Sequence, residues 1–293
     1  MTDGSPSVQP HDDVLIEVQS LASLPSNSVL VVDCRFVLSD PAQGERDFHA
    51  AHIPGAVYAN LDRDLSDLSR KGLGRHPLPA PDAFAKTLSR WGWRRGRRIV
   101  AYDAQGGAMA AARLWWMLKS AGMEASVLDG GWQAWRAAGL PIASGEITPR
   151  VPLKLALQFD PQRSVNYAEL AALREQPSAL ILDAREAARF RGEFEPIDRI
   201  AGHVPGAVNR AFAMNLDAAA RFKPAAVLRA EFTALLGERA PHNVVHMCGS
   251  GVFACHNQLA MEVAGLPGSR VFVPSWSGWS SDPIRPVATG DVP

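Results

Sequence analysis

The 293-residue chain has few cysteines, no net charge and no long apolar run. Only Cys34, Cys248 and Cys255 occur, which is too few for a disulfide scaffold and suits a reducing compartment. Lys plus Arg total 30 and Asp plus Glu total 30, so charge gives no reason to expect nucleic acid or an anionic membrane as a partner. No apolar stretch approaches the roughly 20 residues of a membrane span, and the polar first residues do not resemble a signal peptide. We therefore expect a soluble cytoplasmic protein.

The chain contains two copies of one sequence pattern, and its length allows two ordinary domains. Four features recur in the same order: VVDCR at 31–35 and ILDAR at 181–185, AHIPGAV at 51–57 and GHVPGAV at 202–208, Asp103 and Cys248 after similar apolar runs, and Trp132 and Trp135 answered by Trp276 and Trp279. Two copies are too few for a solenoid, so we interpret the pattern as a tandem duplication of one domain.

Each copy alternates expected strands with an expected helix. Short β-branched runs predict buried strands, and apolar stretches that end in Ala-Gly predict helices. The expected strands are 28–35, 97–103 and 125–131 in the first copy and 179–185, 242–247 and 269–275 in the second; the expected helices are 108–122 and 253–265. This alternation predicts an α/β fold with a parallel sheet in each half.

The stretch HMCGSGVFACH at 246–256 places Cys248 at the end of an expected strand, a few residues before an expected helix. Ligands of parallel sheets gather at the carboxyl ends of strands. Gly249 and Gly251 let the backbone curl so that N–H groups point inward, and the helix dipole adds to this anion-stabilising nest. Such surroundings favour a thiolate, so we predict that Cys248 is a nucleophile.

Other functions for this stretch are disfavoured. Cys255 lies at no common zinc spacing from Cys248, and a disulfide between them would have to cross a strand, a turn and a helix. A phosphatase loop would need an arginine where Ala254 stands. We interpret Cys255 and Cys34 as core residues and His246 as structural.

The first copy has Asp103 at the position that Cys248 occupies in the second. It therefore keeps the pattern without the nucleophile. We expect one half of the protein to perform the chemistry and the other to serve as its partner.

Together these motifs resemble those of tandem rhodanese-type sulfurtransferases, from about residue 14 to 290. CGSGV at 248–252 resembles the active loop of 3-mercaptopyruvate sulfurtransferases, SWSGW at 275–279 a C-terminal signature, and HIPGA and HVPGA a domain-start signature. The resemblance implies two tandem rhodanese-like domains, each a parallel β-sheet flanked by helices. We expect an N-terminal domain without the active cysteine at 1–143, a linker at 144–160 and a catalytic domain at 161–293.

The resemblance also implies a reaction. Cys248 would take sulfur from a donor as a persulfide resting on the amides of the loop, and a thiol, cyanide or thioredoxin-like acceptor would remove it. Thiosulfate-preferring members carry basic loop residues where this chain has Gly249 and Ser250, which favours 3-mercaptopyruvate. In mercaptopyruvate enzymes a proton relay accompanies the cysteine, and the matching residues here are Ser250, His76 and Asp62.

The resemblance further implies a set of substrate-binding residues. Arg189 matches the arginine for the donor's carboxylate, whereas Arg199 stands in a segment one residue shorter and can equally be a solvated charge. Phe253 replaces a usual threonine and adds an apolar wall. The full implied set is Arg189, Arg199, Gly249, Gly251, Val252 and Phe253.

Three alternatives remain beside the mercaptopyruvate enzyme. These are a thiosulfate sulfurtransferase, a non-catalytic sulfur carrier and a module that binds a partner protein. The arginine-rich segment at 90–98, with Trp91 and Trp93, is interpreted as a solvated helix end rather than a nucleic-acid site. Trp115 and Trp116 are expected in the core or between domains. We expect a monomer without cofactor or metal.

Overall fold

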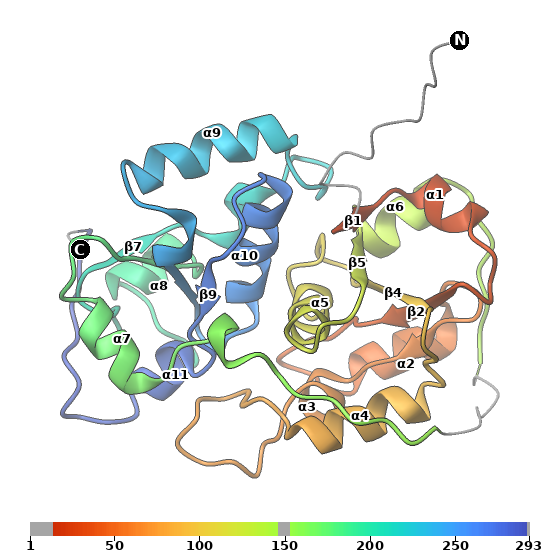
Figure 1. Cartoon of the computed structure of the whole chain (residues 1–293), viewed down its shortest axis with the longest axis horizontal. Coiled ribbons are helices and arrows are strands. Elements are labelled where there is room, and N and C mark those ends of the chain that lie inside the picture. Colours follow the sequence, from red (N-terminus) through yellow and green to blue (C-terminus); the bar gives the residue numbers. More distant parts are fainter. Residues whose placement is uncertain (1–13, 146–152, 292–293) are drawn as a thin grey trace.

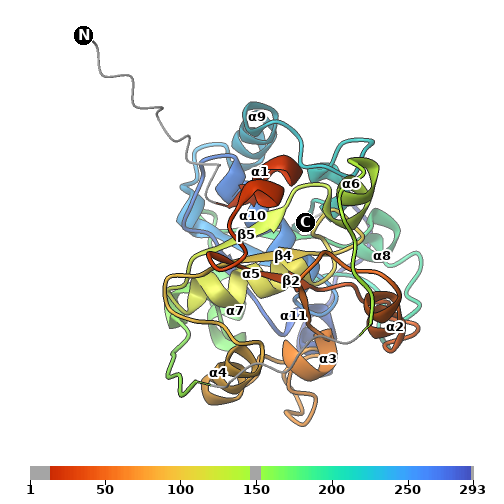
Figure 2. The ribbon, with the colours of Figure 1, turned by 90° about the vertical axis from the view of Figure 1, so that its right-hand side faces the viewer.

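The computed structural model describes residues 14–145 and 153–291, which form two α/β units side by side (Figure 1). Figure 2 views the molecule from the side of the N-terminal unit, with the other unit behind it. Part of the expected linker, residues 146–152, lies outside the described residues. In the described part no helix combines the length and apolar character needed to cross a membrane.

The N-terminal unit is built on a parallel sheet in the order β1-β5-β4-β2-β3. Its strands are β1 (Leu15–Ile16), β2 (Val29–Asp33), β3 (Val57–Tyr58), β4 (Arg98–Tyr102) and β5 (Ala125–Leu128). Its helices are α1 (Val18–Ser23), α2 (Gln43–Ala50), α3 (Leu61–Asp64), α4 (Pro81–Arg90), α5 (Ala111–Ser120) and α6 (Gly131–Ala137).

The C-terminal unit repeats this plan, with a parallel sheet in the order β7-β6-β8-β9. Its strands are β6 (Leu180–Asp183), β7 (Ala207–Asn209), β8 (Val244–Met247) and β9 (Arg270–Val271). Its helices are α7 (Tyr167–Leu173), α8 (Ala187–Arg191), α9 (Ala225–Leu236), α10 (Phe253–Val263) and α11 (Ser275–Trp279), with 3-10 turns η2 (Pro161–Arg163), η3 (Phe212–Asn215) and η4 (Pro241–Asn243). A bridge from Ser164 to Val271 takes the place that β1 has beside β5. The predicted duplication therefore extends to strand order.

Helices cover both faces of the first sheet because its strands are apolar on both sides, as expected for buried parallel strands. Val29 and Val31 of β2 pack with α1, α2 and α6, whereas Leu30 and Val32 pack with α4 and α5. The second sheet is covered in the same way, by α7, α8 and α11 on one face and by α9 and α10 on the other.

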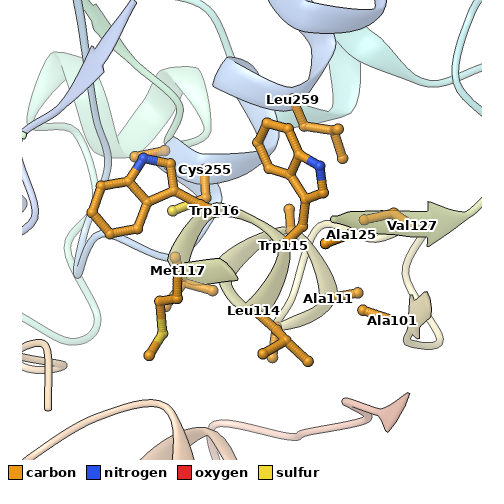
Figure 3. Packing of buried hydrophobic residues seen from close by; sticks show 14 of the residues in the cluster. Ala101, Ala111, Leu114, Trp115, Trp116, Met117, Ala125, Val127, Cys255 and Leu259 are labelled. Carbon is orange, nitrogen blue, oxygen red and sulfur yellow. The ribbon is translucent and has the colours of Figure 1, made fainter. Parts of the chain in front are cut away.

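The two units share one hydrophobic core through α5 and α10. Figure 3 shows Trp115 and Trp116 of α5 pointing toward Cys255 and Leu259 of α10, while Leu114 points back into its own domain. Trp115 and Trp116 are fully buried, and their contacts with α10 place them between the two domains. This contact fixes the carboxyl ends of the two sheets relative to each other, and the candidate site lies there.

Candidate active site

Cys248 lies directly after β8 and is separated from α10 by four residues, two of which are glycines. Gly251 has a φ of +81°, and a Cβ on it would lie 2.3 Å from the carbonyl oxygen of Val273, so only glycine fits there. The Gly251 N–H donates to the Cys248 Sγ at 3.2 Å, so one loop amide points toward the thiol as expected for an anion-stabilising nest. Cys248 is 1% exposed and carries a free thiol.

The SWSGW segment holds this loop from behind through α11. The Cys248 N–H donates to the Ser275 Oγ at 3.1 Å, and the amides of Trp276 and Ser277 donate to the carbonyls of Cys248 and Gly249, each at 2.9 Å. Ser275 adopts a left-handed φ of +51°, a strained conformation for a serine. The second repeat of the tryptophan motif therefore positions the reactive loop as well as packing in the core.

Ser250, His76 and Asp62 form one hydrogen-bonded row that crosses the domain boundary. The His76 Nδ1 lies 2.8 Å from the Ser250 Oγ, and the His76 Nε2 lies 3.2 Å from the Asp62 Oδ1. Asp62 belongs to the first turn of α3, whose N-cap Asn60 accepts hydrogen bonds from the amides of Asp62 and Arg63. His76 follows in the segment between α3 and α4 and is 3% exposed.

The surroundings of His76 determine which of its nitrogens carries the proton. Burial lowers the pKa of His76, Asp62 opposes this effect, and the charges of Arg113 and Arg75 lower the pKa further. The ring is therefore neutral at neutral pH. Because an ionised Asp62 can only accept, the proton lies on Nε2, and Nδ1 accepts from the Ser250 hydroxyl.

A small cavity of about 60 Å³ brings most of the sequence-predicted residues together. Its lining includes Cys248, Gly249, Ser250, Val252, Phe253, His76 and Arg189. The Phe253 ring stacks on Phe212 with centroids 4.3 Å apart, so it forms the expected apolar wall. Asp62 and Gly251 are not among the lining residues: Asp62 contacts the Nε2 of His76, and the Gly251 N–H donates to the Cys248 Sγ.

Two guanidinium groups lie above the loop, and one of them is Arg75 rather than Arg199. A Cβ on Gly249 would lie 3.3 Å from the Nη2 of Arg75 and 3.5 Å from the Nη1 of Arg189. Arg199 is exposed and is not among the residues that line the cavity. This agrees with the interpretation of Arg199 as a solvated charge. Arg75 lines the cavity beside His76, although the sequence reasoning did not single it out.

A rhodanese-like domain model matches residues 17–138 and 166–282 of the chain. The chain belongs to the rhodanese family. The predicted family and the predicted two-domain α/β fold are thereby confirmed.

Relatives of the chain carry the names of both candidate donors. The chain is 48% identical over 281 residues to a probable 3-mercaptopyruvate sulfurtransferase of Pseudomonas aeruginosa, covering 94% of this chain and 98% of that protein. It is 36% identical to a putative thiosulfate sulfurtransferase of Mycobacterium tuberculosis, covering 97% and 99%. The structure of the 3-mercaptopyruvate sulfurtransferase from Leishmania major superposes with a TM-score of 0.83 at 30% identity, covering 95% of this chain and 76% of that chain.

The first rhodanese domain fills the equivalent nest with a carboxylate. The Asp103 Oδ1 accepts from the amides of Gln105 and Gly107, and the Oδ2 accepts from those of Met109, Ala110 and Ala111, all within 3.2 Å. Burial raises the pKa of Asp103, and these donors act in the opposite direction. Residues 108–110, expected in the helix, lie in the turn before α5, where the amides of Met109 and Ala110 donate to Asp103.

Arg113 of α5 is a second residue that sequence reasoning missed. Its guanidinium is fully buried and donates to the carbonyls of Gly251 at 3.2 Å and His76 at 3.0 Å. Burial lowers the pKa of Arg113. The Cys248 loop and His76 are thus attached to one side chain. A charged residue in the apolar first half of this helix was the signal in the sequence.

Proposed function

We propose that this protein is a sulfurtransferase that takes the sulfur of 3-mercaptopyruvate onto Cys248 and passes it to a second nucleophile. The observation that supports this most strongly is the row from Asp62 through His76 to Ser250, which ends in the cavity that Cys248 lines. When 3-mercaptopyruvate gives up its sulfur, the leaving group is a carbanion, which needs a proton in this cavity. When thiosulfate gives up its sulfur, the leaving group is sulfite, which does not.

In the first half-reaction the Cys248 thiolate attacks the sulfur of mercaptopyruvate. A bond forms between the two sulfurs, the carbon–sulfur bond of the donor breaks, and its electron pair leaves with the carbon as pyruvate enolate. The thiol proton of the donor ends on that carbon, which gives pyruvate and a Cys248 persulfide anion. The half-reaction takes no net proton from water. The proton moves from the sulfur of the donor to its carbon, so the reaction needs a group that accepts this proton and returns it.

Ser250 and neutral His76 can hold that proton. The Ser250 hydroxyl donates to the His76 Nδ1, so it can take the donor's proton as its own moves to the ring. Asp62 then stabilises the imidazolium that forms, because its carboxylate lies 3.2 Å from the Nε2. Reversal of these transfers returns the proton to the enolate carbon.

The persulfide on Cys248 would be held by the amides of the same loop. The Gly251 amide donates to the Cys248 Sγ, and the eleven-residue α10 begins beside it with the positive end of its dipole. In the second half-reaction a thiol, cyanide or a thioredoxin-like dithiol attacks the outer sulfur. The sulfur–sulfur bond breaks, and its electron pair regenerates the Cys248 thiolate.

Thiosulfate is the alternative donor, and a sulfur carrier or partner-binding module is the alternative class. The space next to Gly249 supports mercaptopyruvate, because any side chain there would press against Arg75 and Arg189. A basic loop residue of the kind that suits a dianion would therefore place a third positive charge beside these two guanidinium groups. The assembled proton relay supports an enzyme over a carrier, since a carrier has no use for it.

We extend the proposal to organisation and location. The expected boundaries, 1–143, 144–160 and 161–293, are supported by the strands, which all lie within the two outer ranges. Three free, buried cysteines suit the reducing cytoplasm. A monomer is proposed because the two domains complete each other's core and site within one chain.

The test is sulfur transfer to cyanide by the purified protein, with kcat/KM compared for 3-mercaptopyruvate and thiosulfate. We expect a mercaptopyruvate preference of tenfold or more, which corresponds to about 1.4 kcal/mol in transition-state binding. Cys248→Ser is the control and should abolish transfer without changing the folded structure. A thiosulfate preference would refute the choice of donor, and transfer to cyanide by neither donor would favour the carrier.

A further inference from the structure

The five residues that end in His76 belong to the first domain but lie against the second. Figure 1 shows the chain between α3 and α4 extending from the first domain toward α11. We call residues 72–76 the His76 strap. At its start the carbonyl of Gly72 accepts a hydrogen bond of 2.7 Å from the Tyr167 hydroxyl of α7. One domain therefore supplies the relay histidine, and the other supports the backbone that carries it.

The strap and α11 approach each other so closely that neither has room for a side chain at the contact. Gly74 has a φ of +85°, and a Cβ on it would lie 2.4 Å from the carbonyl oxygen of Pro274. A Cβ on Gly278 of α11 would lie 3.2 Å from the backbone nitrogen of Gly74 and 2.4 Å from the Tyr167 hydroxyl. The two glycines allow the backbones to meet directly, so the strap has a defined position on α11.

Ser277 of α11 joins the strap to the loop that carries the nucleophile. Its Oγ accepts a hydrogen bond of 2.9 Å from the backbone N–H of Arg75. Its own N–H donates to the carbonyl of Gly249 at 2.9 Å. Arg75 directly precedes His76, and Gly249 directly follows Cys248. One serine thus connects the backbone beside the relay histidine to the backbone beside the nucleophile.

The ring of Tyr167 is held in place by two contacts away from the strap. It packs edge-on against Phe272 with centroids 5.3 Å apart, and the Arg285 guanidinium lies 3.9 Å from its centroid. Burial raises the pKa of Tyr167, and Arg285 acts in the opposite direction. The hydroxyl therefore stays protonated at neutral pH and donates to Gly72. A phenylalanine in place of Tyr167 would keep the ring and lose this hydrogen bond.

We propose that Tyr167 and Ser277 are positioning residues, which act through the His76 strap to hold the His76 Nδ1 within hydrogen-bond distance of the Ser250 hydroxyl. This inference rests on the proposed function and adds two residues that do not line the cavity. The observed distance of 2.8 Å lies within the range of about 2.6–3.2 Å that proton transfer requires. A misplacement of about 1 Å can cost about a hundredfold in rate. Loss of either anchor should therefore slow the proton transfer while Cys248 stays in place.

The experiment compares Tyr167→Phe and Ser277→Ala with the wild-type full-length protein in steady-state transfer to cyanide. With mercaptopyruvate we expect kcat to fall about tenfold or more and KM to stay within about twofold, because the relay is displaced and the donor contacts remain. With thiosulfate we expect a change in kcat of less than about threefold, since sulfite leaves without a proton. Ser277→Ala keeps the amide that donates to Gly249. Equal losses with both donors would overturn the proposal, because they would indicate damage to the Cys248 loop.

Two further variants separate positioning from a general loss of stability. Ser277→Thr restores the hydroxyl and should return kcat with mercaptopyruvate to within about threefold of the wild type. Tyr58→Phe is the matched control, because the Tyr58 hydroxyl also donates to a backbone carbonyl, that of Arg35 at 3.1 Å, but within the first domain. It should leave kcat within about twofold for both donors. A loss in Tyr58→Phe as large as that in Tyr167→Phe would contradict a specific role of the strap.

Hydrogen exchange of the Arg75 amide, followed by mass spectrometry of overlapping peptides, tests the strap without sulfur transfer. We expect exchange about tenfold faster or more in Tyr167→Phe and Ser277→Ala, because each variant releases one anchor. Unchanged exchange and unchanged kcat in an active enzyme would overturn the positioning role and leave the sulfurtransferase standing. Faster exchange in a protein that transferred sulfur from neither donor would support the anchors and refute the proposed function alone.

Discussion

Asp103→Asn tests whether the nest in the first domain binds a negative charge. The carboxylate accepts two amide hydrogens on its Oδ1 and three on its Oδ2. An asparagine has nearly the same shape, but its NH2 group cannot accept. In the better of its two orientations the amide oxygen keeps the three donors, and the amides of Gln105 and Gly107 lose their acceptor and face an NH2 group.

The loss of stability follows from those two amides. Leaving one buried donor unpaired costs about 1–3 kcal/mol. Because the Gly107 amide is buried whereas Gln105 is an exposed residue, the variant should lose about 1–3 kcal/mol of unfolding free energy. Urea denaturation measures this as a lower midpoint with an unchanged m-value. Asp160→Asn is the control, since this exposed carboxylate accepts one amide hydrogen from Gln162 and should change stability by less than about 0.5 kcal/mol. A loss below about 1 kcal/mol for Asp103→Asn would refute the charged nest.

Two further predictions concern the relay and acid stability. Ser250→Ala should lower kcat with mercaptopyruvate about a hundredfold or more and with thiosulfate far less, because sulfite leaves without a proton; equal losses in steady-state assays would remove Ser250 from the relay. Burial lowers the pKa of His256 to about 4. Below about pH 6.5, where this histidine is protonated in the unfolded chain, the folded state therefore binds fewer protons than the unfolded state. The free energy of unfolding consequently falls as the pH is lowered from about 6.5. Between pH 7 and 5, His256→Gln should lose about 2 kcal/mol less stability than the wild type in urea titrations, and an equal loss would refute the neutral histidine.

The features that the sequence predicted well are local. The end of β8, the glycine turn and the start of α10 all lie within 246–256, so their pattern is sufficient to place the thiol. The duplication was visible because each repeated motif has the same structural task in both copies. In each domain, for example, an arginine forms a buried salt bridge to an aspartate two residues before it and lies over a tryptophan, as Arg35 does over Trp132 and Arg185 over Trp276.

The features that it did not predict depend on contacts between distant segments. Asp198 meets Arg75 across more than a hundred residues and a domain boundary, and nothing beside either residue signals the pair. The contacts of Arg113 are equally hard to predict, because its partners are backbone carbonyls of distant segments. The two-residue strands β1, β3 and β9 are also too short to show an alternating pattern, and they form because neighbouring strands offer hydrogen-bond partners.

The two nests explain why a duplicated domain can lose its nucleophile and remain useful. Seven residues separate Asp103 from α5, whereas four separate Cys248 from α10. The longer loop brings five amides onto one carboxylate, which occupies the place where the second domain would carry its persulfide. The first domain therefore holds its loop and α5 in place without chemistry. From that helix Arg113 donates to the carbonyl of Gly251, so the first domain positions the Cys248 loop of the second.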